Sequence, residues 1–293
     1  MMRFSARIAL LVILVLVPFG LPALQAGAAD PTAPAPVPAP APAAGEVQAG
    51  EVQAGEVQAD AVHPSARELI AAALDLTRGR SSYAEMSMRI HRPDWERTSR
   101  LVAWTRGRED ALIRFTEPAR DAGNATLKQG DGMWTFTPKL NRTIRLPFSL
   151  MSQSWAGSDF SYNDLSRSDK LLKHYELTLV NAELGDDGHW IYTVDAVPHE
   201  NAPVVWGKEE LVLRDDFVMI SETFFDQDLE PLKRMQALEI GELGGRTFST
   251  RMRMSQLDEP EHFTEVVYED AQFDIALSDE LFTLFALRSG ATP

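Results

Sequence analysis

The chain has 293 residues, no cysteine and a formal net charge of −15. This acidic balance lacks the basic footprint of a nucleic-acid-binding protein, and the absence of cysteine excludes disulfides, thiolate metal sites and a cysteine nucleophile. The length suffices for one large domain or two small ones.

The first 29 residues have the three parts of a secretory signal peptide. Arg3 and Arg7 provide a positive start, residues 8–19 form an apolar run, and Ala26-Gly27-Ala28 fits an A-x-A cleavage site. The apolar run is shorter than the roughly 20 residues that a membrane-spanning helix needs. We therefore expect an exported protein whose signal peptide is cleaved.

Residues 30–62 are predicted to be a disordered linker. A Pro-Ala-rich stretch is followed by three copies of AGEVQ. Pro-Ala runs favour extended, semi-rigid conformations, and the repeat is too short and too polar to bury a core. The folded domain is predicted to span residues 63–293.

One helix is predicted at the start of this domain. Ser65 and Glu68 have the spacing of a capping box. Apolar residues then recur at helical spacing, and Gly79 follows as a stop signal. The pattern indicates a single amphipathic helix.

Beyond residue 81 the apolar residues alternate with polar ones, which is typical of half-buried strands. Between residues 84 and 273 this alternation and the intervening turn signals predict roughly ten or eleven short strands in one antiparallel sheet. A sheet of this size is expected to curl. The predicted fold is mainly β with few helices: a curved, incompletely closed antiparallel β-sheet, or half-barrel, covered by the N-terminal helix and a central segment. A closed barrel filled by its own side chains is the alternative.

The central segment, residues 154–167, reads SWAGSDFSYNDLSR and separates the two series of strands. Aromatic residues alternate in it with turn-forming residues, and Asp159 or Ser161 is predicted to cap a short helix. The aromatic side chains would then pack down onto the sheet. The segment is either a lid over an ordinary core or a lid over a ligand cavity.

The apolar residues of the concave face and of the lid are the predicted ligand-binding residues. Methionine is flexible and polarizable, which suits an adaptable binding surface, although each methionine is equally compatible with ordinary core packing. The predicted cavity and lid residues are Met86, Met88, Trp104, Phe115, Trp134, Phe136, Phe148, Met151, Trp155, Phe160, Met252 and Met254.

Catalytic motifs are absent from the sequence. It contains no HExxH, GxSxG, GxGxxG or P-loop, and its six histidines are scattered. Adjacent acidic pairs such as Glu209-Glu210 would point to opposite faces of a strand. We therefore expect no enzyme activity, no catalytic residue, no metal site and no cofactor.

Three stretches, LVAWTRGREDALIRFTEPARDAGNATLK, DGMWTFTPKLNRTIRL and GSDFSYNDLSR, resemble the outer-membrane lipoprotein-sorting protein family, a LolA-like group. The resemblance extends over residues 65–285, and GSDFSYNDL is its most specific part. It implies a LolA/LolB-type fold and a periplasmic carrier of acylated molecules that performs no covalent chemistry. Some members of this group work beside lipid exporters of the resistance-nodulation-division type.

The leading hypothesis is a monomeric periplasmic carrier that binds a lipid or an acylated protein moving toward the outer membrane. The alternative is a non-enzymatic adaptor of an envelope lipid-export transporter, in which the protein's own side chains fill the cavity and no ligand exchanges. A third, weaker alternative is a hydrolase.

Overall fold

The computed structural model describes residues 63–166 and 170–290. The predicted signal peptide and linker lie outside these residues, as does Arg167 at the end of the predicted lid, so the signal peptide, the linker and this end of the lid remain predictions. None of the helices in the described part is long and apolar enough to cross a membrane.

The predicted N-terminal helix is confirmed as α1 (Ala66–Arg78). Ser65 and Glu68 form the capping box, in which the Glu68 amide donates to the Ser65 hydroxyl and the Ser65 amide donates to the Glu68 carboxylate. The helix ends at Gly79, whose φ of +59° favours glycine. A Cβ atom at this position would lie 2.9 Å from the Asp274 carboxylate.

The described residues form one antiparallel sheet of thirteen strands, two or three more than expected. The strand order is β6-β5-β4-β3-β2-β1-β13-β12-β11-β10-β9-β8-β7, so β6 and β7 are the two edges and the sheet stays open. The strands are β1 (Ser81–Arg92), β2 (Trp95–Arg106), β3 (Asp110–Glu117), β4 (Ala125–Gln129), β5 (Gly132–Thr137), β6 (Arg142–Arg145), β7 (Tyr175–Leu184), β8 (Trp190–Pro198), β9 (Lys208–Arg214), β10 (Met219–Phe225), β11 (Pro231–Leu243), β12 (Arg246–Gln256) and β13 (Phe263–Phe273).

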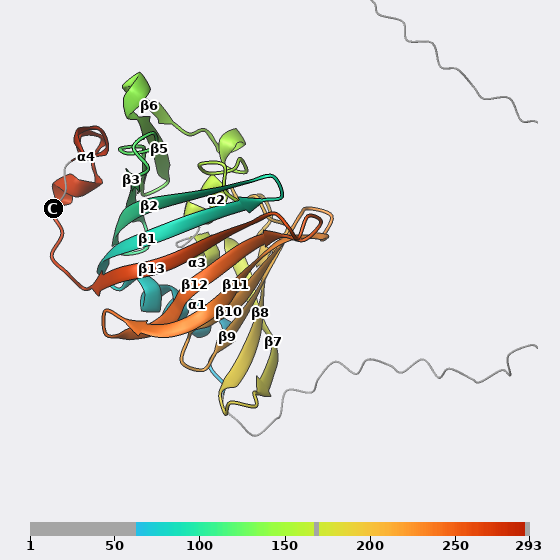
Figure 1. Cartoon of the computed structure of the whole chain (residues 1–293). Coiled ribbons are helices and arrows are strands. Elements are labelled where there is room, and N and C mark those ends of the chain that lie inside the picture. Colours follow the sequence, from blue (N-terminus) through green and yellow to red (C-terminus); the bar gives the residue numbers. More distant parts are fainter. Residues whose placement is uncertain (1–62, 167–169, 291–293) are drawn as a thin grey trace, which may run out of the picture. The chain divides into compact units, whose positions relative to one another are not determined.

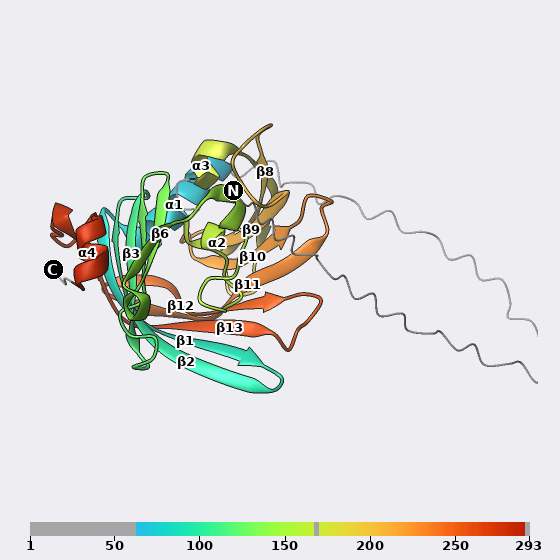
Figure 2. The ribbon, with the colours of Figure 1, turned by 90° about the horizontal axis from the view of Figure 1, so that it is seen from above.

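The sheet curves around three helices, and we call the side that they cover the inner face. Figure 2 shows α1, α2 and α3 within the curve, with α4 on the opposite side, the outer face, beside β3. The remaining helices are α2 (Tyr162–Ser166), α3 (Lys170–His174), α4 (Leu284–Ser289) and the short 3-10 helices η1 (Pro138–Leu140), η2 (Phe148–Leu150) and η3 (Asp279–Phe282).

Strand alternation divides the apolar residues between two separate cores. On the inner face, Leu69 and Ile70 of α1 pack against residues of β7, β8 and β9 such as Val194. On the outer face, Phe282 and Leu287 of the C-terminal segment cover β2 to β5. The two halves of the sheet meet at the centre, where β1 pairs with β13 (Figure 1).

Over the central strands the outer face is polar. The buried Glu265 carboxylate accepts hydrogen bonds from Arg89, Arg251 and Arg253, with the Arg89 and Arg251 bonds at 2.8 and 3.0 Å. Burial by itself raises the pKa of Glu265, but these three guanidinium groups together lower it to about 2.

Candidate functional site

The predicted lid segment folds as a compact turn followed by α2. The Trp155 amide donates to the Phe160 carbonyl at 2.7 Å, which closes the turn. Ser161 then caps α2 because its hydroxyl accepts from the Asp164 amide at 3.3 Å, while its own amide donates to the Asp164 carboxylate at 2.6 Å. Of the two residues predicted to cap the helix, Ser161 is therefore the cap.

Asp159 instead attaches the lid segment to the sheet. Its carboxylate forms an ion pair with Arg92 of β1 at 3.0 Å and accepts a hydrogen bond from the Thr264 hydroxyl of β13 at 2.6 Å. The Asp159 side chain is 2% exposed. A charge buried this far needs its partners to offset the cost of leaving water, so this contact holds one end of the lid segment in place.

A second buried ion pair holds the other end. Lys233 of β11 pairs with Asp164 of α2, and their side chains are 5% and 4% exposed. The Lys233 ammonium also donates to the Asp159 carbonyl at 3.2 Å and lies 4.7 Å from the centre of the Trp206 ring. The polar residues of the GSDFSYNDL stretch therefore fix the lid segment to the inner face.

Beneath the lid segment the inner face contains three adjoining hollows, which we call the central cavity. Their volumes are about 230, 190 and 160 Å³, and Tyr268 of β13 borders all three. The largest lies under Trp155, Phe160 and Leu165 of the lid segment. The other two extend along the C-terminal half of α1, beside Leu74 and Thr77.

The structure brings together seven of the twelve predicted site residues on the inner face and under the lid. Five of them border the largest hollow, namely Met86, Met88, Trp155, Phe160 and Met252. Phe115 packs on the Trp155 ring with 5.3 Å between the ring centres. Met254 lies farther along the same face and packs against Trp206 and Phe224.

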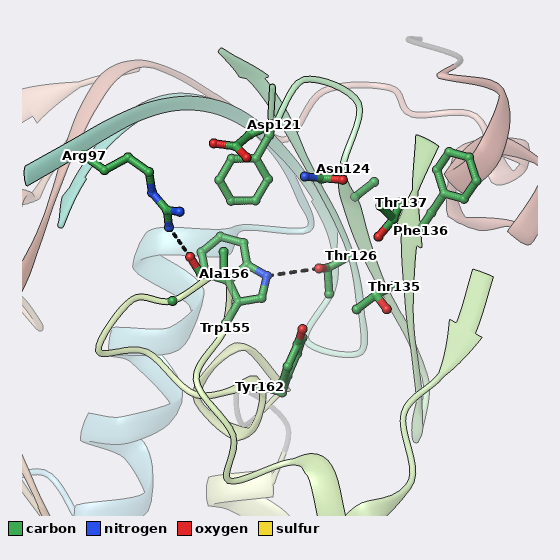
Figure 3. A pocket seen from close by; sticks show the side chains of 13 residues that line it. Arg97, Asp121, Asn124, Thr126, Thr135, Phe136, Thr137, Trp155, Ala156 and Tyr162 are labelled. Atoms are coloured by element: carbon green, nitrogen blue, oxygen red, sulfur yellow. Dashed lines mark hydrogen bonds between the residues drawn. The ribbon is translucent and has the colours of Figure 1, made fainter. Parts of the chain in front are cut away.

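The prediction that Trp104, Trp134 and Phe136 line the cavity is wrong. Their strand positions place them on the outer face, in the core that the C-terminal segment covers. Trp104 is opposite Leu112, which is opposite Leu127, and residues directly opposite each other in an antiparallel pair share a face. Figure 3 shows the Phe136 ring directed away from the lid segment.

Phe148 and Met151, which were also predicted to contribute, do not border the central cavity. Phe148 lies on η2 and is 55% exposed. Met151 is buried, and it supports the lid segment because its backbone carbonyl accepts a hydrogen bond from the Asn163 amide at 2.8 Å. Both residues come before the start of the lid segment at residue 154, and only the lid segment covers the cavity.

Sequence reasoning missed several residues of the cavity wall. Val266 and Tyr268 of β13 are opposite Met88 and Met86, and their alternation along the strand could have identified them. The small side chain of Ala103 also borders the hollows. A small side chain contributes to a cavity by leaving space, so the sequence pattern does not identify Ala103 as a residue of the cavity wall.

A polar pocket of about 430 Å³ lies on the other side of Trp155, between the lid segment and β3, β4 and β5 (Figure 3). The Trp155 indole N–H donates to the Thr126 hydroxyl at 3.1 Å, which fixes the ring between the pocket and the central cavity. The other polar side chains of the pocket wall are Arg97, Asp121, Asn124, Thr135, Thr137 and Tyr162.

One group in the described part of the chain brings three possible metal ligands together, although no metal site was expected. Atoms of His189, Asp215 and Asp216 lie within 4.8 Å of one another. His189 pairs with Asp215 at 2.5 Å, and Arg214 pairs with Asp216. The hydrogen bond from His189 lowers the pKa of Asp215. All three side chains are therefore engaged in ion pairs within the chain.

Comparison with solved structures identifies the class of fold. A DUF1329 family protein from Desulfovibrio piger superposes with a TM-score of 0.68 and 23% identity, covering 76% of this chain and 97% of its own. A LolA superfamily protein from Nitrosomonas europaea gives a TM-score of 0.65 and 22% identity, with 76% and 100% coverage. A domain from Vibrio parahaemolyticus described as an outer membrane lipoprotein-sorting protein gives 0.66 and 20%, with 76% and 97% coverage.

The fold is therefore LolA-like, as the sequence resemblance predicted. A family model described as "uncharacterized protein" matches residues 107–289, which is more than half of the chain, and the chain belongs to that family. Comparison with curated proteins finds no match.

Proposed function

We propose that this protein is a non-enzymatic periplasmic carrier that binds the acyl chains of a lipid or an acylated protein in its central cavity. The observation that carries the proposal is the apolar inner face, which is hollow beneath a separately anchored lid segment. Each methylene moved from water into such a cavity contributes about 0.8 kcal/mol, so binding needs no covalent chemistry.

The division of the cavity into three hollows suggests that the lid segment moves when a ligand is loaded. Together the hollows reach the roughly 300–1,000 Å³ of typical ligand pockets, but the largest one, about 230 Å³, does not reach it alone. Phe160 and Leu165 of the lid segment project over this hollow. Displacing them would enlarge it without opening the sheet, because they belong to a segment outside the strands.

The fold class and the predicted signal peptide support a periplasmic location. In this proposal the carrier is a monomer that moves its ligand toward the outer membrane. Its proposed partner is an inner-membrane exporter of the resistance-nodulation-division type.

Two neighbouring residues of β13 allow a controlled test. Val266 faces the largest hollow, whereas Val267 pairs with Ser87 and Arg251 on the outer face. Val266→Trp would fill the cavity, and Val267→Trp adds the same side chain on the opposite side. We expect Val266→Trp to abolish binding of a dansyl-labelled fatty acid and Val267→Trp to bind it as the wild type does.

Melting curves of both variants establish that the folded proteins are being compared, since overpacking costs about 1–3 kcal/mol. Native mass spectrometry of the gently purified wild type should also find co-purifying acyl species. Equal binding by Val266→Trp and the wild type would exclude the central cavity as the site. No binding by the wild type after delipidation and re-exposure would favour the adaptor alternative.

A further inference from the structure

The polar pocket beside Trp155 contains a cation that is only partly satisfied. Arg97 of β2 reaches into the pocket wall and donates to the Ala156 carbonyl of the lid segment (Figure 3). Its Nε atom is buried and has no hydrogen-bond partner among the described residues. Within that same part of the chain, Arg97 forms no ion pair with a carboxylate. Arg97 as a whole is half-buried, but a buried N–H without a partner costs free energy, so an anion that accepted from it would be stabilised.

The acidic residue of the pocket, Asp121, forms no ion pair with Arg97 in the described part of the chain. Asp121 forms its own ion pair with Arg120 at 3.3 Å, and its side chain is 24% exposed. The rest of the wall offers neutral hydrogen-bonding groups, namely the hydroxyls of Thr135, Thr137 and Tyr162 and the amide of Asn124. A guanidinium in a pocket whose other side-chain donors are neutral is suited to a singly charged oxyanion, because hydrogen bonds with an ionised partner are the stronger ones.

The position of the pocket connects it with the central cavity. The Trp155 side chain borders both spaces, and the indole is only 5% exposed. One side of this residue meets Met86 and Met88, and the other meets the threonine-rich wall. A ligand with an apolar part and an anionic part could therefore place its apolar part in the central cavity on one side of Trp155 and its anionic part in the polar pocket on the other side.

We propose that the polar pocket binds the phosphate headgroup of an anionic amphiphile whose acyl chains occupy the central cavity. This inference rests on the proposed carrier function and narrows its ligand to one with a phosphodiester near the acyl chains. Arg97 is the anion-binding residue of this site.

The test compares two lipids with identical acyl chains, phosphatidylglycerol and diacylglycerol. The full-length exported protein is delipidated, equilibrated with mixed micelles containing both lipids in equal amounts, re-isolated and analysed for bound lipid by mass spectrometry. We expect the wild type to prefer phosphatidylglycerol by about tenfold, the factor that one charge-assisted hydrogen bond can supply. Arg97→Gln should lose this preference and keep its diacylglycerol binding.

Arg100→Gln is the matched control. Arg100 lies on the same strand, but it is 55% exposed and pairs with Glu117 and Glu269. It should keep the wild-type preference. A phosphatidylglycerol preference that is equal in Arg97→Gln and the wild type would overturn the headgroup site while leaving the carrier function intact. Absence of both lipids from the wild type would overturn the carrier function as well.

Inorganic phosphate separates a lipid headgroup from a free anion. Phosphate alone should leave the melting temperature of the wild type nearly unchanged, because without acyl chains the anion gains only the contacts of the pocket. If phosphate instead raises the melting temperature of the wild type but not of Arg97→Gln, and the wild type shows no lipid preference, the pocket is a free-anion site and the headgroup proposal is wrong.

Discussion

The ion pair between Asp164 and Lys233 gives a quantitative test of how the lid segment is held. Asp164→Asn keeps the size of the side chain, but its single oxygen can accept from either the Ser161 amide or the Trp206 indole N–H, which bond to different oxygens of the Asp164 carboxylate. It removes the charge opposite Lys233, whose side chain is 5% exposed. The variant therefore leaves a buried ammonium with a neutral neighbour.

Removing one partner of a buried ion pair ordinarily costs about 3–5 kcal/mol. Lys233 keeps the Asp159 carbonyl at 3.2 Å and the faces of Trp206 and Phe224 at 4.7 and 5.0 Å. These contacts favour the lower end, so we expect a loss of about 3 kcal/mol. In a domain of this size each kcal/mol shifts the melting temperature by about 2–4 °C, which corresponds to a fall of about 6–12 °C.

Differential scanning calorimetry measures the change, and Glu109→Gln serves as the control. Glu109 pairs with Lys173 at 2.6 Å, but both side chains are about half exposed, at 55% and 49%, and exposed pairs contribute at most about 1 kcal/mol. Because Asp164 lies on the lid segment, the variant should also bind the dansyl-labelled fatty acid faster in stopped-flow experiments. A fall in stability no larger than that of Glu109→Gln would refute the buried-pair reasoning.

Three further predictions concern the lid, the outer face and the linker. Trp155→Ala should lower the free energy of unfolding by about 3 kcal/mol, the low end for a large aromatic residue, because hollows already lie beside it, and it should reduce the affinity for the fatty-acid probe at least tenfold. Phe282→Ala, in the outer core, should lower the melting temperature and leave the probe affinity unchanged. An equal loss of probe affinity in both variants would mean a global effect. The pKa of Glu265 is about 2 in the folded protein against an ordinary 4.5, so its stabilising contribution is complete above about pH 4.5 and is lost as the pH falls toward 2. Urea titrations at a series of pH values should therefore show that the free energy of unfolding falls less steeply with decreasing pH in Glu265→Gln than in the wild type. The same pH dependence in both proteins would contradict this. Deleting residues 30–60 should leave the melting temperature of the domain nearly unchanged, whereas a drop of many degrees would show that the linker docks on it.

Local patterns in the sequence predicted most of the secondary structure. The capping box of α1 and the period-two alternation depend on neighbouring residues alone, and both are found in the structure. Alternation separates the two faces of each strand but does not say which face is inner. Trp104 and Met86 occupy equally clear apolar stripes, and only the position of the C-terminal segment, with Phe282, makes the stripe of Trp104 an outer core.

The candidate site depended more on distant contacts, which limited its prediction. The lid segment was recognisable because aromatic and turn-forming residues alternate within it. Its attachment was not, since Arg92 and Lys233 come from strands far from it in the chain. Arg97 likewise looks like any strand arginine until the fold places it beside Ala156.

The pairing of β1 with β13 has a consequence for how the protein folds as it is synthesised. Strands β1 to β6 and strands β7 to β13 can each form by pairing with the next strand along the chain, but Met88 meets Val266 only when the end of the domain is present. A chain that is synthesised from its N-terminus therefore leaves the edge of β1 that pairs with β13 exposed until β13 is present. Unpaired strand edges promote aggregation, so we expect the chain to be most prone to aggregation while only this half of the sheet has formed.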